Sequence, residues 1–457
     1  MFVILLVCVS ALTIGYTLIL FAYGSRPVID LRQRPASMRF VVMIPCLDEE
    51  LVIGRSIERL LAIDDDDLVI LVIDDGSSDR TAEIVSSYRS EQVHLFQRVA
   101  PNCRKGKGEA LNAAYRYVRE ETERYGLDPH RVVLAVLDAD GRLDPHAIDK
   151  VAPCFADPAI GAVQIKVRIH NAPDATLARL QDYEFATFTE VFQRARARLG
   201  SSGLGGNGQF TRLSSLMDLG DSPWTDCLTE DLELGINLLL RGHRNDFVPS
   251  AWVSQQGVTS WRPLVRQRSR WFQGHLQCLR MVLPVLRSDL RPIAKFDLCF
   301  HLLNSVAMLL FQTVSLWFLA MIGWWALTSP TQTFTTFTSG LTPAFVYLFA
   351  FGLVPLATFA YLRTEPDLSV AKAMGFSHLY VLYTYMWWLA GWRAVYRQLV
   401  GATSWAKTAR TVGTGDEAPV TAATPLWHDV VGSDVVGSEV VHPQIAHVDV
   451  VHAEQAA

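Results

Sequence analysis

The stretch Val132-Val133-Leu134-Ala135-Val136-Leu137-Asp138-Ala139-Asp140 is a run of aliphatic residues that ends in two carboxylates. An earlier stretch has the same form, since the apolar residues 69–73 are followed by Asp74, Asp75 and Gly76. Apolar runs that stop at Asp or Gly are typical of buried parallel strands. Ligands of open α/β sheets bind beyond the carboxyl ends of the strands. The two stretches therefore predict one acidic crevice, and the alternative of two solvated turns is weaker because both occur in order.

The acidic crevice favours a bound cation. Asp138 and Asp140 are two residues apart, so on an extended backbone their side chains face the same side. This is the outline of a site for a metal ion and a phosphate group.

The segments around these strands alternate between strand and helix patterns. Residues 41–45 predict a first strand, and the acids at 48–50 begin a helix at its positively polarised end. Ser and Asp after the second strand are good caps for a helix over 80–89. A further helix near 110–125 precedes the strand before Asp138. The pattern predicts an α/β domain with a parallel, Rossmann-type sheet.

A basic, glycine-containing segment, Arg104-Lys105-Gly106-Lys107-Gly108, lies between the two acidic strand ends. Glycines let backbone N–H groups approach an anion, and lysines add positive charge at a helix start. The segment fits a nucleotide diphosphate, although a solvated turn is the alternative. Neither the Walker spacing nor a dinucleotide fingerprint is present, so an ordinary NTPase is disfavoured.

Two later segments contain candidate binding groups. Residues 201–209 are the most glycine-dense stretch of the chain, which permits close backbone approach to a sugar or phosphate; a plain loop is the alternative. Thr229-Glu230-Asp231 precedes an apolar-periodic helix, so its acids are either functional or a helix cap.

The segment Arg266-Gln267-Arg268-Ser269-Arg270-Trp271 contains another candidate site. On a helix, Gln267, Arg270 and Trp271 share one face at i, i+3 and i+4. Arginine and tryptophan side chains form a clamp for pyrophosphate and a stacking platform for a sugar ring. The alternative is an ordinary basic helix beside a membrane.

Four apolar blocks predict contact with a lipid bilayer. Residues 2–23 are uncharged, about long enough to span, and lack the features of a cleaved signal. Arginines follow, so the positive-inside rule places the next region in the cytoplasm. Later blocks cover 298–327, 343–362 and 374–392, with an external loop expected over 331–342. We predict a multi-pass protein of the cell membrane, with a transmembrane helix at 1–24, a cytoplasmic domain at 25–295 and transmembrane or interfacial helices at 296–400.

Composition excludes some other classes of protein. The seven cysteines are scattered without a C-x-x-C pair, so we expect reduced thiols and no zinc site. A net charge of −5 is close to neutral for 457 residues and predicts no nucleic-acid partner. The end of the chain, within 401–457, repeats Val-Val between small and polar residues and is expected to be disordered.

In this order, the Asp-Asp-Gly, Asp-x-Asp, Thr-Glu-Asp and Gln-x-x-Arg-Trp motifs resemble those of the membrane-embedded processive family-two glycosyltransferases. That group includes cellulose, chitin, hyaluronan and poly-N-acetylglucosamine synthases. The resemblance covers residues 41–271 closely and the apolar blocks more loosely, and it implies a GT-A-like glycosyltransferase domain over 25–295.

The resemblance also implies residue roles. Asp74 and Asp75 would contact the base and ribose, Lys107 would support the nucleotide, and Asp140 with Asp138 would reach a divalent metal on the diphosphate. Asp231, beside Glu230 in the same motif, matches the general base that deprotonates the acceptor. The Gln-x-x-Arg-Trp motif would hold the diphosphate and the acceptor end, through Gln267, Arg268, Arg270 and Trp271.

These roles suit an inverting transfer in one displacement. One base and a neutralised leaving diphosphate suffice, and no second carboxylate nucleophile is needed. Mg²⁺ or Mn²⁺ suits an oxygen-only site.

The resemblance implies transfer of glucose or N-acetylglucosamine from a UDP-sugar to a growing β-linked polysaccharide that passes through the helices. Accessory export or modification proteins are possible partners. The alternatives are non-processive transfer to a lipid acceptor, and a membrane transporter that only senses nucleotide.

Residues 403–410, with Trp405, are similar to the gating loop of chitin and hyaluronan synthases, except that Ala406-Lys407 replaces Gly-Thr. Three full spans would put this loop outside, whereas the nearby basic residues favour the inside. We therefore expect one apolar block, near 374–392, to be re-entrant or interfacial.

Overall fold

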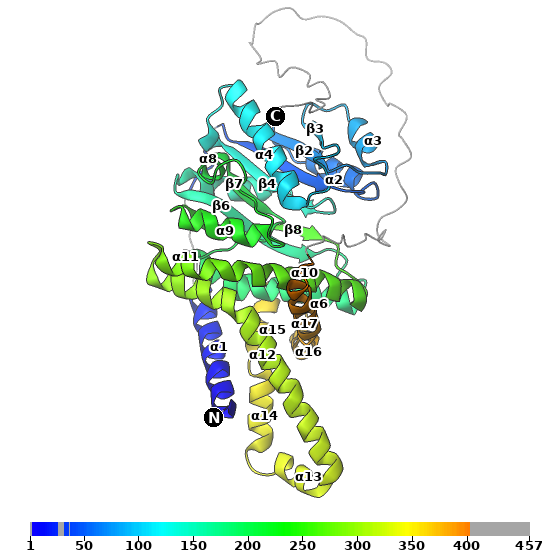
Figure 1. Ribbon diagram of the computed structural model, residues 1–457, viewed down its shortest axis with the longest axis vertical. Helices are drawn as coiled ribbons and strands as arrows, with labels where there is room; N and C mark the ends of the chain where they lie inside the picture. Colours follow the sequence, from blue (N-terminus) through cyan, green and yellow to red (C-terminus); the bar gives the residue numbers. More distant parts are fainter. Residues whose placement is uncertain (1, 26–31, 36, 403–457) are drawn as a thin grey trace, which may run out of the picture.

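The computed structural model describes residues 2–25, 32–35 and 37–402, with side chains described from residue 11 onward. One eight-stranded sheet occupies one end of the molecule, and a group of apolar helices extends from the other end (Figure 1). The strand order is β3-β2-β1-β4-β7-β6-β8-β5. The strands are β1 (Arg39–Cys46), β2 (Leu68–Asp74), β3 (Val93–Gln97), β4 (Val132–Val136), β5 (Arg142–Leu143), β6 (Ile160–Ile169), β7 (Gln209–Arg212) and β8 (Arg244–Gln255).

The sheet is mixed, which corrects the prediction of a parallel sheet. Strands β1 to β4 are parallel as expected, but β7 runs antiparallel to both β4 and β6, and β5 runs antiparallel to β8. The glycine-rich segment enters the sheet as β7, where Gln209 is paired with Val136. This pairing places the glycine-rich segment beside the acidic end of β4.

Helices cover both faces of the sheet because strand side chains alternate. On one face, Phe40, Val42 and Ile44 of β1 pack in the core with α2 (Ile53–Leu61). On the other face, Val41 and Met43 pack with α4 (Lys107–Arg124) and α9 (Glu230–Leu240). Smaller helices are α3 (Thr81–Ser86), α5 (Ala147–Val151) and α8 (Leu213–Met217). Strands β2 and β4 are thereby held on either side of β1, with their carboxyl ends at the same edge of the sheet.

A layer of helices runs across the molecule between the sheet and the apolar helices (Figure 1). It contains α6 (Thr176–Phe188), α10 (Trp261–Cys278) and α11 (Val282–Arg287), and a π-helical turn, Thr189–Gln193, joins α6 to α7 (Arg194–Leu199). Leu264 of α10 packs against Tyr383 and Met386 from later helices. This layer supplies the part of the site farthest from the sheet.

Among the described residues, one helix is long and apolar enough to cross a membrane: α12 (Pro292–Thr328), with 37 residues and only 11% of its most apolar window buried. α1 (Phe2–Gly24) is also apolar. The block at 343–362 is broken into α14 (Thr342–Phe351) and α15 (Val354–Leu362). The expected loop over 331–342 is largely helical, because residues 330–338 form helix α13, which is bent by 78° from α14.

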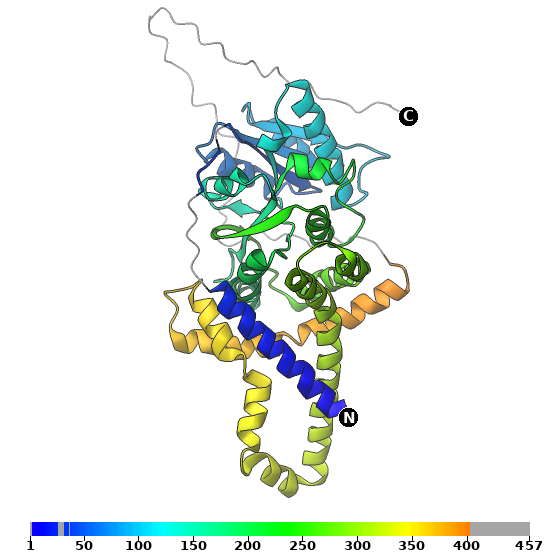
Figure 2. The ribbon, with the colours of Figure 1, turned by 90° about the vertical axis from the view of Figure 1, so that its left-hand side faces the viewer.

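The block at 374–392 is also broken, into α16 (Val370–Tyr383) and α17 (Met386–Leu399). Figure 2 shows these helices crossing the direction of α12 and not running along it. α17 is tied to α10, because Arg397 Nε donates to Gln273 Oε1 at 3.0 Å. Between residue 292 and residue 402, where the described part of the chain ends, three full spans are therefore not observed. The predicted gating segment and the predicted disordered tail lie outside the described residues.

Candidate active site

A cavity of about 2460 Å³ begins at the carboxyl ends of the parallel strands and continues between α1, α12, α14 and α16. Its sheet end is lined by charged side chains, and its far end by side chains of the apolar helices. Eight of the residues predicted from the sequence line it: Asp75, Lys107, Asp138, Glu230, Asp231, Gln267, Arg270 and Trp271. Segments far apart in the chain therefore meet in one space.

The end of β2 forms the outer edge of the cavity. Asp75 is buried, and its Oδ1 accepts a hydrogen bond from Arg98 Nη1 at 2.5 Å. Burial raises the pKa of Asp75 above its usual range, although the Arg98 guanidinium opposes the rise. Asp74 is not among the lining residues, because its Oδ1 accepts from the Ser77 N–H at 2.9 Å and shapes the turn after β2.

Lys107, the first residue of α4, lies against the end of β4. Its Nζ donates to Asp138 Oδ1 at 2.6 Å, and the Asp138 N–H donates to Asn207 Oδ1 at 3.2 Å. Burial lowers the pKa of the Lys107 ammonium, but Asp138, Glu230 and Asp231 together raise it above its usual range. The cavity therefore contains a fixed positive charge where the sequence predicts a diphosphate.

The predicted metal ligands are both at the end of β4, but only Asp138 lines the cavity. Asp140 is buried, and its Oδ2 accepts from the Gln256 N–H at 2.9 Å. No group of three or more His, Cys, Asp or Glu residues capable of holding a metal occurs in the described part of the chain. Two carboxylates with a substrate diphosphate are a donor set that Mg²⁺ and Mn²⁺ use. The carboxylates present are thus of the kind such an ion takes: Asp138 faces the cavity, Asp140 lies two residues further along, and the donor diphosphate would complete the set.

Glu230 and Asp231 form the first turn of α9 and face the same cavity. Burial raises the pKa of Glu230 to about 7, Asp231 adds to the rise, and Lys107 and Arg270 oppose it. Burial also raises the pKa of Asp231, against the Leu232 N–H, which donates to Asp231 Oδ1 at 2.8 Å. Raised carboxyl pKa values in a cleft are typical of groups that exchange protons.

The glycine-rich segment approaches Asp231 closely. Gly206 has a φ of +70°, and a Cβ built there would lie 2.8 Å from Asp231 Oδ2. Both the backbone conformation and the contact therefore require glycine. The sequence predicted a close approach of this backbone to a sugar or phosphate, and in the structure Gly206 lies close to Asp231, the candidate base.

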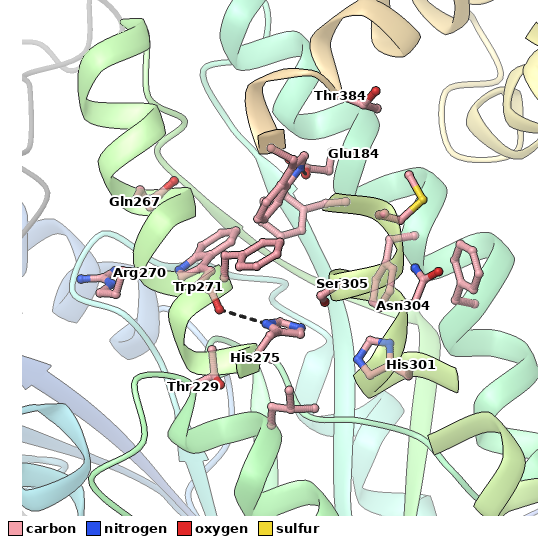
Figure 3. A pocket seen from close by; sticks show the side chains of 18 of the residues that line it. Glu184, Thr229, Gln267, Arg270, Trp271, His275, His301, Asn304, Ser305 and Thr384 are labelled. Carbon is pink, nitrogen blue, oxygen red and sulfur yellow. Dashed lines mark hydrogen bonds between the residues drawn. The ribbon is translucent and has the colours of Figure 1, made fainter. Parts of the chain in front are cut away.

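Helix α10 forms the wall opposite α9. Gln267, Arg270 and Trp271 reach the cavity from one face of the helix, and His275 follows one turn later (Figure 3). The Trp271 carbonyl contacts His275 Nδ1 at 3.0 Å. Burial lowers the pKa of His275, so the imidazole is favoured in its neutral form. The wall thus contains one guanidinium at the donor end and uncharged groups beyond it.

Arg268 does not line the cavity, which differs from its expected contact with the diphosphate. Its side chain is fully buried, and its Nη2 donates to Glu184 Oε2 at 2.6 Å. Its guanidinium carbon lies 4.0 Å from the ring centroid of Trp271. Glu184 also accepts from Tyr383 Oη at 3.1 Å and from Trp387 Nε1 at 2.8 Å. Arg268 therefore supports Trp271, and Glu184, which lines the cavity, holds Arg268 in place.

Sequence reasoning missed three residues of the site. His275 could have been found, since it lies four residues after Trp271 and so on the same helical face. Asn207 lies in the glycine-rich segment but gave no signal of its contact with Asp138. Glu184 is one acid on a helix, and nothing in its local pattern indicates the three donors around it. Trp405 lies outside the described residues.

The described cysteines are free thiols. Two of them meet beside the site: Cys227 Sγ and Cys278 Sγ are 3.6 Å apart, next to Thr229. Both side chains are buried.

Comparison with known proteins identifies related chains. Residues 35–274 match the family described as "Glycosyltransferase like family 2". The chain is 31% identical over 242 residues to "Beta-monoglucosyldiacylglycerol synthase" of Synechocystis sp., which is 52% of this chain and 47% of that protein. It is 29% identical over 260 residues to "Poly-beta-1,6-N-acetyl-D-glucosamine synthase" of Staphylococcus aureus, which is 55% of this chain and 58% of that protein. The chain thus spans about half the length of these curated relatives.

A solved structure shares the architecture. The mannosyltransferase PcManGT of Pyrobaculum calidifontis, determined with GDP-Man and Mn²⁺, matches with a TM-score of 0.58 at 18% identity, over 87% of this chain and 98% of that one. At this identity the similarity is one of fold.

Proposed function

The chain belongs to glycosyltransferase family 2, and on that premise we propose that it transfers a hexose, with inversion, from a UDP-sugar to a hydroxyl group of a membrane-borne acceptor. The observation that carries the proposal is one cavity lined both by the Lys107–Asp138 pair and by Asp231. A donor diphosphate and an acceptor base require these two features in one space.

On the donor side, Asp75 would hold the nucleoside, while Lys107 and Arg270 would face the diphosphate. Asp138 and Asp140 would hold Mg²⁺ or Mn²⁺, which neutralises the leaving diphosphate when bound. The related mannosyltransferase was determined with Mn²⁺, which supports this assignment. The donor would thus be bound by charge at one end of the cavity.

On the acceptor side, Asp231 would take the hydroxyl proton while the oxygen attacks the anomeric carbon. The raised pKa of Asp231 brings its basicity closer to that of a useful proton acceptor at neutral pH. Trp271, fixed by the Arg268 guanidinium behind it, would stack on the acceptor. The bond between the anomeric carbon and the diphosphate oxygen breaks as the new glycosidic bond forms, and UDP leaves with the electron pair of the broken bond.

Two acceptor classes fit this chemistry. A growing polysaccharide is supported by the Gln267-Arg270-Trp271 wall and by the poly-N-acetylglucosamine synthase relative. A lipid is supported by the apolar far end of the cavity and by the monoglucosyldiacylglycerol synthase relative. In either case we place the sheet domain on the cytoplasmic side and α12 in the bilayer. Family membership disfavours the nucleotide-sensing transporter.

The test measures UDP release by the purified full-length protein in lipid–detergent micelles, with UDP-glucose, UDP-N-acetylglucosamine and GDP-mannose as donors and Mn²⁺ or Mg²⁺ present. Turnover with a UDP-hexose supports the proposal, while turnover with GDP-mannose alone contradicts the donor assignment. Asp221→Asn, at an exposed aspartate outside the cavity, serves as the matched control for Asp231→Asn. Equal activity in both variants would overturn the proposed base.

A further inference from the structure

The cavity is larger than its proposed donor. Small-molecule sites usually measure about 300–1000 Å³, whereas this cavity measures about 2460 Å³. A nucleotide sugar at the charged end would leave more than half of the volume for another molecule. The chemistry of the remaining part therefore indicates the second substrate.

The far end of the cavity, here termed the apolar compartment, lies between α12 and α14. Among the side chains that the structure describes, no lining residue contributed by α1 or by α12 to α17 is Asp, Glu, Lys or Arg. Aromatic and branched aliphatic side chains dominate this compartment: Phe318, Leu319, Ile322, Phe345, Val346 and Phe349. Such a surface favours hydrocarbon over hydroxylated ligands.

The polar groups near the compartment are bonded to one another. Gln312 Nε2 donates to the Thr384 carbonyl at 2.9 Å, and the Ser315 and Tyr385 hydroxyls are 2.7 Å apart. A sugar chain here would bury hydroxyl groups with few remaining partners, and each unmatched hydroxyl would carry a free-energy cost. The compartment is therefore poorly matched to a polysaccharide.

An uncharged polar section, here termed the vestibule, separates the compartment from Trp271. It contains His275 of α10 and His301, Asn304 and Ser305 of α12, which line one stretch of the cavity (Figure 3). A lipid phosphate is usually bound by arginine or lysine, but no lining residue of the vestibule is either. The vestibule suits a neutral headgroup that accepts and donates hydrogen bonds.

We propose that the second substrate is an uncharged lipid, with its acyl chains in the apolar compartment, its headgroup in the vestibule and its hydroxyl at Asp231. This inference rests on the proposed function and names the acceptor class. Leu319 and Phe345 line the compartment yet are 55% and 62% exposed, so the compartment opens sideways toward the surroundings of α12 and α14. A lipid would enter through that side and would not pass through water.

The experiment uses the full-length protein in mixed micelles with radiolabelled UDP-glucose and UDP-N-acetylglucosamine. The acceptors are 1,2-dioleoylglycerol, dioleoylphosphatidic acid, undecaprenyl phosphate and a soluble β-linked oligosaccharide. We expect label in an organic-phase product with 1,2-dioleoylglycerol. Preferential labelling of a phosphorylated lipid, or of the oligosaccharide or a polymer, would overturn the inference.

A matched pair of variants on α14 tests the location. Val346 lines the compartment, whereas Leu348, two residues away, does not and is 63% exposed. Val346→Trp should lower the rate with 1,2-dioleoylglycerol by about 10-fold or more, because one methylene in an apolar pocket can already change selectivity by that factor. Leu348→Trp should retain the rate, and equal effects of both variants would contradict the assignment.

Measuring UDP binding distinguishes a failure of the lipid inference from a failure of the proposed function. Both α14 variants should bind UDP with unchanged affinity, since the nucleotide end is remote from α14, and this also verifies folding. If the protein binds and slowly hydrolyses a UDP-sugar but no lipid accepts the hexose, the lipid inference fails and the proposed donor chemistry stands. If no UDP-sugar is bound or turned over, the proposed function itself fails.

Discussion

Asp231 lies among charges of both signs, and their balance sets the pH at which it can accept a proton. Burial raises its pKa, while the Leu232 N–H and the Lys107 ammonium lower it. Gly206 leaves room for it on the other side, because a Cβ built at that position would lie 2.8 Å from Oδ2. The carboxylate is thus held in place without being covered by a bulky neighbour.

Replacing Asp231 by Asn tests the base directly. Asn keeps the shape and most hydrogen bonds but cannot take a proton, so the transfer rate should fall by about 10²–10⁴-fold. UDP affinity should change little, because the donor is held by other residues. Asp231 is the second residue of α9, after the N-cap residue Thr229, so it does not cap the helix. A variant with near wild-type turnover would limit Asp231 to a structural role in this first turn.

The pH dependence of turnover follows from the same carboxylate. A carboxylate base works only when deprotonated, so kcat falls as the pH drops through the pKa of Asp231. Burial raises this pKa, so the decline should begin at a higher pH than for an exposed aspartate, whose pKa is about 3.9. The measurement is kcat against pH at saturating substrates, and a profile that stays flat into the acidic range of an exposed aspartate would contradict the assignment.

Asp140 tests the metal assignment. Asp140→Ala removes one of the two carboxylates at the end of β4, so Mn²⁺ should no longer strengthen UDP binding. A titration of UDP with and without EDTA measures this, with the exposed Asp149→Asn as the matched control. Undiminished wild-type turnover in EDTA would remove the metal from the mechanism.

At the scale of elements, the sequence predicted the parallel strands well and the later part of the sheet poorly. The ends of β2 and β4 can be predicted from the sequence, because in each case an apolar run stops abruptly at carboxylates. The antiparallel strand β7 could not be predicted, because Gln209–Arg212 contains no apolar run. It becomes a strand by pairing with β4 and β6. Likewise, the face of α10 predicted Gln267, Arg270 and Trp271, but the burial of Arg268 depends on Glu184 of α6.

Glu184 links α6, α10, α16 and α17 through one carboxylate, so its loss should affect several elements together. Glu184→Gln would leave the buried Arg268 guanidinium without a counter-charge, and breaking such a pair typically costs about 3–5 kcal/mol. We expect a lower Tm and, through the displaced Trp271, a higher KM for the acceptor with a nearly unchanged KM for the donor. The exposed Glu120→Gln is the matched control. A lower Tm with both KM values unchanged would limit Glu184 to a structural role.

For the whole molecule, hydropathy predicted which segments are apolar but not how they are arranged. The block 343–362 has the composition of one span, yet the chain bends at Gly352 and continues as two helices. The block 374–392 breaks similarly, and α17 packs along α10, where Phe272 packs with Ala394 and Arg397 is hydrogen bonded to Gln273. Such breaks depend on contacts between distant residues, and a window of composition does not contain them.

The sideways opening beside Leu319 and Phe345 has a kinetic consequence. If the enzyme takes its acceptor from the surface of a micelle or bilayer, its rate depends on the surface concentration of the acceptor and not on the bulk concentration. Adding inert detergent at fixed enzyme and acceptor should therefore slow the reaction, while diluting the complete micelle suspension with buffer that contains the same concentration of UDP-sugar should leave the rate per enzyme molecule nearly constant. An acceptor drawn from water would give the opposite pair of results.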